Sequence, residues 1–191
     1  TNLMFIGSQQ EVMAAFTEAG WLQASDLNVK SAMKTATATL RQTGYNDAPV
    51  STLHLQGKAP DIVFQKSLNT FAKRHHLRIW QLKPTYQGRE VWIAAATHDI
   101  ATTNERAGTK WSHRIDPHID RERDWVETDL LFIGSATSYA EVDRPGAPKN
   151  LSNATGDTIV TDGKISVVAL AKTSAPKDKN TPPTLTTRPT Q

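Results

Sequence analysis

Hydrophobic residues near the start of the chain have the spacing of a short strand followed by a helix. The strand is the apolar run Leu3–Ile6. Ser8 and Glu11 then have the spacing of a capping box, in which the hydroxyl and the carboxylate each accept a backbone N–H. Helical spacing continues to a stop at Gly20, with these apolar positions on one face: Val12, Ala15, Phe16 and Ala19.

Two later stretches also have the helical period. Apolar residues over 28–42 repeat at i, i+4, i+7 and i+11, and Gly44 ends the pattern. Asp116 followed by Pro117 is a typical helix start, with Asp at the N-cap and Pro at the first helical position. We expect this third helix to reach Ile133 and to stop at Gly134.

Between these helices the hydrophobic period changes to two, which is typical of strands. Strands are predicted over 61–68, 74–82 and 89–100, with a loop over 84–88 between the last two. A Ser/Asn/Pro/Gly-rich connection follows over 135–157. A final hairpin is predicted from 158–161 and 164–170, joined by a turn at Asp162-Gly163.

This order of elements predicts an α+β fold, with a mainly antiparallel sheet of about five to seven strands packed against three helices. The length of 191 residues and the 38% hydrophobic content suit one domain. The composition changes at about 172 to Lys, Thr and Pro. We therefore predict a domain over 1–171 and a tail or linker over 172–191.

The tail accounts for the net charge of the chain. It carries four basic residues and one acidic residue, and this excess equals the whole formal charge of +3. The predicted domain is therefore formally neutral, and its Lys and Arg residues are not clustered as nucleic-acid binding requires. We expect no nucleic-acid partner.

The composition excludes several other classes. There is no cysteine, so disulfides, thiol catalysis and Cys-based zinc sites are ruled out. No apolar run approaches the roughly 18 residues of a membrane-spanning helix, and no signal peptide is recognisable. Because the chain begins at Thr1, we expect a processed protein or an excised domain.

Five of the six histidines lie between 75 and 118, and strand alternation separates them by face. His75 shares its face with the apolar Leu77 and Ile79, and a half-buried pair with Asp99 is predicted for it. A polar face is predicted on the other side of the strand, from His76, Arg78 and Trp80, joined by His98. Cross-strand structural pairing explains such residues, and so does a catalytic site built from His75, His98 and Asp99.

Arg123 falls within the apolar stripe of the third predicted helix. An arginine that faces a sheet must be paired or must reach a polar pocket, because an unpaired buried charge is costly. Asp120 and Glu127 flank it at helical spacing, which favours an intrahelical ion-pair ladder. The alternative is an arginine aimed at an anionic ligand, together with Arg78 and Arg121.

Metal binding is a further possibility for this region. His113, Asp116 and Asp120 are candidate ligands, although their spacing matches no zinc motif. No nucleophile elbow, Walker loop or dinucleotide-binding glycine motif occurs, and the cofactor is unknown.

Four strings of the sequence are similar to the LssY C-terminal domain family. They are DIVFQK (61–66), RHHLRIW (74–80), GREVWIAAATHD (88–99) and HRIDPHIDRERD (113–124), and the resemblance extends over about 2–171. The family is bacterial, and its domain often follows membrane segments of the DedA or PAP2 phosphatase type. The resemblance therefore implies envelope lipids, isoprenyl phosphates or surface polysaccharides as the surrounding biology.

Taken together, the sequence predicts an accessory domain of a bacterial envelope protein that binds an anionic small molecule or lipid head group. The expected contacts are His76, Arg78, Trp80, Arg121 and Arg123. The membrane would be reached through a segment absent from this chain, with the periplasmic side favoured. The alternatives are a hydrolase with a His/Asp site, with or without a metal, and a purely structural interaction module.

Overall fold

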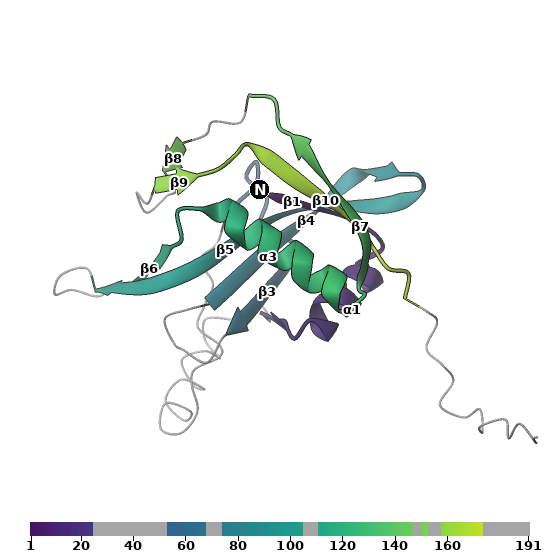
Figure 1. Ribbon diagram of the computed structural model, residues 1–191, viewed down its shortest axis with the longest axis horizontal. Coiled ribbons are helices and arrows are strands. Elements are labelled where there is room, and N and C mark those ends of the chain that lie inside the picture. Colours follow the sequence, from purple (N-terminus) through teal and green to yellow (C-terminus); the bar gives the residue numbers. More distant parts are fainter. Residues whose placement is uncertain (25–52, 68–73, 105–110, 147–149, 153–157, 174–191) are drawn as a thin grey trace, which may run out of the picture.

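The structure is a computed structural model that describes residues 1–24, 53–67, 74–104, 111–146, 150–152 and 158–173. These residues form two helices and ten strands (Figure 1). The elements are β1 (Leu3–Ile6), α1 (Gln9–Glu18), β2 (Leu22–Gln23), β3 (Ile62–Ser67), β4 (Arg74–Tyr86), β5 (Arg89–Asn104), β6 (Trp111–Ile115), α3 (Ile119–Phe132), β7 (Ala136–Asp143), β8 (Asn150–Ser152), β9 (Thr158–Val160) and β10 (Lys164–Leu170). Within these residues no helix is long and apolar enough to span a membrane.

Eight strands form one sheet in the order β2-β3-β4-β5-β1-β10-β7, and β6 pairs with the end of β5. Every strand pair is antiparallel except β1 with β10. The strands β8 and β9 form a separate two-stranded sheet. The mainly antiparallel α+β fold is confirmed, although the sheet has eight strands rather than five to seven.

The first helix begins and ends as its sequence predicts. Ser8 Oγ accepts the N–H of Glu11, and the Glu11 carboxylate accepts the N–H of Ser8, so the capping box is complete. Gly20 follows the helix with φ +76°, a left-handed conformation that favours glycine. The chain then turns so that Trp21 packs edge-on against Phe16.

The long β4–β5 hairpin extends further than predicted. Gln87 and Gly88 both have positive φ, which is the geometry of a tight two-residue turn. The predicted loop over 84–88 is therefore mostly strand, and β4 runs to Tyr86. A register shift between Leu82 and Thr85 accommodates Pro84, which has no N–H to donate.

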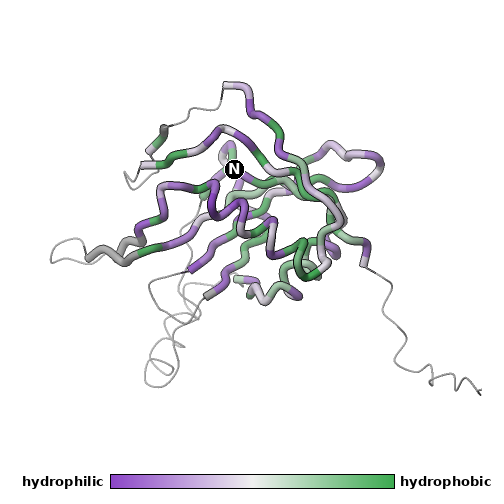
Figure 2. The backbone as a smooth tube through the Cα atoms, viewed as in Figure 1, coloured by the Kyte–Doolittle hydropathy of each residue, from purple (hydrophilic) through white to green (hydrophobic). Residues whose placement is uncertain are grey.

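Both helices pack on the same face of the sheet. Phe16 of α1 contacts Phe5 of β1 and Phe64 of β3, with ring centroids 5.3 and 5.1 Å apart. Val126 and Leu130 of α3 join the same core. Figure 1 shows α3 lying across the strands, and Figure 2 shows hydrophobic positions concentrated beneath the helices, whereas the first turns of α3 are hydrophilic.

The first predicted helix is confirmed at both ends, whereas the last is confirmed at its C-terminal end but not at its start. The predicted helix over 28–42 lies outside the residues that the structure describes. The last helix begins at Ile119 rather than at Pro117, and Asp116 Oδ1 instead accepts the N–H of His118 at 2.8 Å. Its predicted stop at Gly134 is confirmed, since this residue has φ +76°.

The C-terminal third differs most from the prediction. The expected connection over 135–157 contains β7 and β8. The expected hairpin of 158–161 with 164–170 is wrong, because β9 pairs with β8 while β10 pairs with β1 and β7. The turn at Asp162-Gly163 exists, but it passes the chain from one sheet to the other.

Two phenylalanines offer a matched test of this core. Phe16 is fully buried, whereas Phe132 at the end of α3 is 88% exposed. We expect Phe16→Ala to lower the free energy of unfolding by about 3–5 kcal/mol, and Phe132→Ala to change it by less than about 0.5 kcal/mol. Urea unfolding followed by tryptophan fluorescence measures both values. Equal effects of the two substitutions would contradict this assignment of the core.

Candidate functional site

A buried histidine–carboxylate pair joins the sheet to α3. His75 lies on the face of β4 that α3 covers, and its Nδ1 is 2.9 Å from both carboxylate oxygens of Glu122. Only about a twentieth of either residue is exposed. The helical period places Glu122 one turn before Val126, so the carboxylate is carried into the interior on the apolar side of the helix.

The imidazole of His75 is held in a stack of flat side chains. On one side lies the ring of His98, at 4.4 Å between centroids and 7° between planes. On the other side lies Trp125, at 4.1 Å and 16°. The ring of Trp21 meets that of His75 edge-on, with 6.2 Å between centroids, and Lys66 Nζ lies 4.9 Å from the ring centroid of Trp125. The orientation of His75 is therefore fixed by packing as well as by Glu122.

Three ring nitrogens in this stack lack a hydrogen-bond partner within the described part of the chain. They are Nε2 of His75, Nε2 of His98 and Nε1 of Trp21, and all three are buried. Burial and the neighbouring His75 lower the pKa of His98. The negative charges of nearby carboxylates oppose this shift, and that of Glu122 has the largest opposing effect. One potential ligand atom from each of His75, His98 and Glu122 lies within 4.8 Å of the other two.

A second histidine pair lies on the opposite face of the sheet. His76 Nε2 is 2.8 Å from Asp99 Oδ2, and both side chains are buried. The predicted pair of His75 with Asp99 is therefore wrong. The register places His75 opposite His98, so Asp99 points to the other face, where it reaches His76 diagonally.

The predicted polar face contains His76, Arg78 and Trp80, and His98 does not belong to it because it lies under α3. Arg78 Nη1 is 3.5 Å from the hydroxyl of Thr97, and burial lowers the pKa of Arg78 although Asp99 opposes this shift. Trp80 is fully buried, and its Nε1 donates to the carbonyl of Lys58 at 3.0 Å. We call five residues of this face the outer-face cluster: Arg74, His76, Arg78, Trp80 and Asp99.

Arg123 is buried against carboxylates of the chain itself. Its Nη1 and Nη2 donate to the two oxygens of Asp162 at 2.9 and 3.1 Å, and its Nε donates to Asp124 at 2.8 Å. Glu141 and Asp120 lie at 3.1 and 3.5 Å. Burial alone would lower the pKa of Arg123, but its hydrogen bonds to Asp162 and Asp124 outweigh burial and raise this pKa above its ordinary value. These contacts explain the buried charge without a ligand.

The remaining predicted site residues lie on α3 or just before it. Arg121 is exposed, and its nearest carboxylate is Asp116 at 3.7 Å. Asp120 accepts hydrogen bonds from the Thr161 hydroxyl and from the N–H of Asp162, so its carboxylate holds the turn before β10. The side chain of His113 lies outside the described residues, although its backbone pairs with Thr102. Metal binding by His113, Asp116 and Asp120 stays a prediction.

The comparison with protein families agrees with the four strings noted in the sequence. The family model described as LssY C-terminus matches residues 1–165. The chain belongs to this family. The match includes β1, both described helices and all the residues of the two histidine pairs. Neither curated proteins nor solved structures give a match.

Several site residues of this LssY C-terminus domain were missed by sequence reasoning. Glu122 lies about 60° from the centre of the apolar stripe of α3, close enough to be buried. Trp125 and Lys66 were also missed, together with the ion pair of Lys66 with Asp129 at 2.9 Å. Asn2 was missed as well, although its side chain bonds to Ala96 of β5 and to the carbonyl of Ile119. A helical plot that treated glutamate as a possible inward residue would have found Glu122.

Two arginines on α3 of the LssY C-terminus domain test the ionic cluster. Arg123→Met leaves four carboxylates facing one another, so we expect the free energy of unfolding to fall by about 3 kcal/mol. Arg121→Met removes an exposed charge with one long ion pair, so a change below about 0.5 kcal/mol is expected. Chemical denaturation at low ionic strength measures both values. A loss for Arg123→Met no larger than that of Arg121→Met would contradict the structural role.

Glu127 gives a prediction of pH dependence for the same domain. Burial raises the pKa of Glu127, and Asp124 and Glu141 add to this rise against the hydrogen bond from Ser166. The stabilising contribution of Glu127 is thus present below its unfolded value of 4.5 and is lost as the pH rises through the raised pKa. Glu127→Gln keeps an acceptor without the charge. Relative to the original chain, this variant should gain stability from pH 4 to pH 8 in urea unfolding, and an unchanged difference would contradict the shift.

Proposed function

We propose that this LssY C-terminus domain is the accessory domain of a bacterial envelope protein and binds a small phosphate-bearing anion at the outer-face cluster. The phosphate would belong to a lipid head group or a glycan. The observation that supports this proposal most is the placement of Arg74, His76 and Arg78 on one buried face of β4.

The spacing of these three side chains suits a phosphate group. Alternate residues of a strand point to the same face and are about 6.6 Å apart along it. Guanidinium groups at the first and third of these positions can reach inward to one anion placed beside the middle residue. Arginine binds phosphate through two parallel hydrogen bonds, which adds directionality to the charge attraction.

The charges on this face favour an anion over a cation. Of the described residues in the outer-face cluster, two are arginines, one is a histidine and one is a carboxylate, Asp99. Asp99 Oδ2 lies 2.8 Å from Nε2 of His76, so this carboxylate faces a histidine of the same cluster. Because the cluster is buried, the local dielectric is low, and a bound anion would be attracted more strongly than at an exposed basic patch.

Burial also limits the size of the ligand. The exposed fractions of Arg74, His76 and Arg78 are 2%, 6% and 6%. The contacts of such a site need only the phosphate of a head group, and they need no acyl chain. Trp80 supplies an apolar wall beside Arg78, with its indole N–H already bonded to the backbone of Lys58.

The envelope part of the proposal follows from the family resemblance. Its bacterial members often carry the domain after DedA or PAP2 phosphatase segments, which act among lipid phosphates. We propose the same setting here, with membrane contact through a segment outside this chain and the periplasmic side as the location. Arg123 is not required, since its hydrogen bonds to Asp162, Asp124 and Glu141 are internal.

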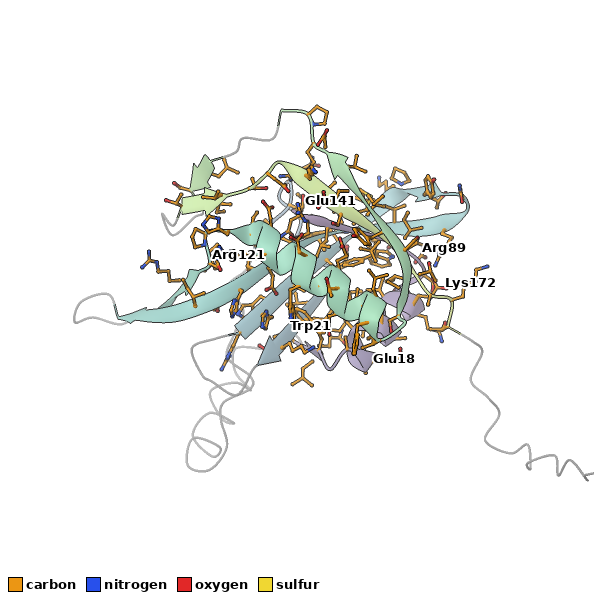
Figure 3. The ribbon with its side chains drawn as sticks, in the orientation of Figure 1. Glu18, Trp21, Arg89, Arg121, Glu141 and Lys172 are labelled. Atoms are coloured by element: carbon orange, nitrogen blue, oxygen red, sulfur yellow. The ribbon has the colours of Figure 1, made fainter. Side chains whose placement is uncertain are left out.

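Titration calorimetry with inorganic phosphate and with glycerol phosphate tests the outer-face cluster. We expect Arg78→Ala to weaken binding by about tenfold or more, because each charge-assisted hydrogen bond lost costs about 1.5–3 kcal/mol. Arg121→Ala, which removes an exposed arginine near the start of α3 (Figure 3), should bind as the original chain does. Thermal unfolding confirms that each variant is folded.

Vesicles separate the two sources of the phosphate. Binding to phosphatidylglycerol vesicles, with Arg78 required, would indicate a lipid head group, and binding only of the free phosphates would indicate a soluble ligand or glycan. An original chain that binds none of these probes would overturn the proposal, and so would an Arg78→Ala variant with unchanged affinity.

A further inference from the structure

The stack beneath α3 contains polar atoms that the rest of the described structure does not satisfy. Nε2 of His98, Nε2 of His75 and Nε1 of Trp21 are buried without a partner, although nearly all buried polar atoms in folded proteins have one. The rings of His75 and His98 are stacked 4.4 Å apart, and the carboxylate of Glu122 adjoins Nδ1 of His75. The unsatisfied His98 ring beside this histidine–carboxylate pair suggests that a bound group is part of this site.

We propose that His75, His98 and Glu122 bind one divalent transition-metal ion of the zinc type. Each residue offers a ligand atom within 4.8 Å of the other two. Imidazole nitrogen with carboxylate oxygen is a ligand set typical of Zn²⁺ and its neighbours, whereas Mg²⁺ and Ca²⁺ prefer oxygen alone. Three protein ligands leave a fourth position for water, which is the arrangement of catalytic rather than structural zinc sites.

The pair of His75 and Glu122 already has suitable geometry for this ion. The ring Nδ1 is equally distant, at 2.9 Å, from both carboxylate oxygens. A single N–H proton is directed best at one acceptor, whereas a metal ion is held well by both oxygens of a carboxylate. Ligand atoms of a tetrahedral zinc lie about 3.4 Å apart, from Zn–ligand distances of about 2.0–2.2 Å. An ion bound to Nδ1 and to Glu122 would replace their hydrogen bond and lengthen the 2.9 Å contact by roughly half an ångström.

His98 is the ligand that must move. Its ring is nearly parallel to that of His75, and a metal ion lies in the plane of each imidazole that binds it. The His98 ring must therefore turn about its Cβ–Cγ bond. His98 is only partly buried, unlike His75, so turning its ring disturbs less packing while Trp125 keeps the His75 ring in place.

The charge of this region suits a cation. Glu122 and Asp116 both lie close enough to act electrostatically on His98. The outer-face cluster is on the other side of the sheet, where Asp99 meets His76. The metal site therefore does not rest on the proposed binding of phosphate, and either one can fail without the other.

Titration of the chelator-treated full chain with Zn²⁺ and with Co²⁺ tests this inference, with no phosphate present. We expect one equivalent of metal, visible absorption bands of tetrahedral Co²⁺, and an increase in Tm on adding Zn²⁺. His98→Ala and Glu122→Gln should each weaken Zn²⁺ binding by about tenfold or more, since even residues behind the ligands have effects of about 10–100-fold. His98→Ala is the safer variant because its side chain is less buried than that of His75.

His54→Ala is the matched control, because His54 is an exposed histidine outside the stack. It should bind Zn²⁺ as the original chain does, and circular dichroism in chelator confirms that every variant is folded. Absence of stoichiometric Zn²⁺ or Co²⁺ binding by the original chain would overturn the assignment. Unchanged affinity in both His98→Ala and Glu122→Gln, or a loss of equal size in His54→Ala, would overturn it as well.

Discussion

The helix α3 buries three ionic side chains against the sheet, and each must find a partner there. Glu122 meets His75 of β4, Arg123 meets the turn before β10, and Glu127 meets Ser166 of β10. An unpaired charge in such a place would cost several kcal/mol. Because the partners lie at separate points on β4, in the turn before β10 and on β10, the three contacts together fix both the position of the helix along its axis and its rotation. The stack around His75 exists only when this docking is correct.

Local patterns predicted the parts of the fold that local chemistry determines. The capping box of Ser8 and Glu11, the stop at Gly134 and the β4–β5 hairpin each depend on residues close in sequence. The strand β7 was missed because seven of its eight residues are exposed and show no alternation of apolar and polar positions. It is a strand because β10 offers it an edge, and this edge is not visible in its own residues.

The site shows the same division between local and distant information. Alternation along β4 correctly assigned His75 and His76 to opposite faces. It could not determine which residue of β5 stands opposite each, so Asp99 was given to the wrong histidine. A shift of one residue in register reverses every face, which makes such errors complete rather than partial. Glu122 was overlooked for a different reason, since an acidic residue near an apolar stripe is ordinarily taken to be solvated.

The central position of β1 has a consequence for how the chain reaches its native state. Leu3 pairs with Ala94 on one side and with Ser166 on the other, so this strand joins the first and last parts of the domain. Contacts between residues so distant in sequence slow folding, because the loop must close before they form. During synthesis β1 can pair with β5 once both have left the ribosome, but its other edge stays unpaired until β10 has been made. Until then that edge can pair with other chains, so this topology raises the risk of aggregation during synthesis.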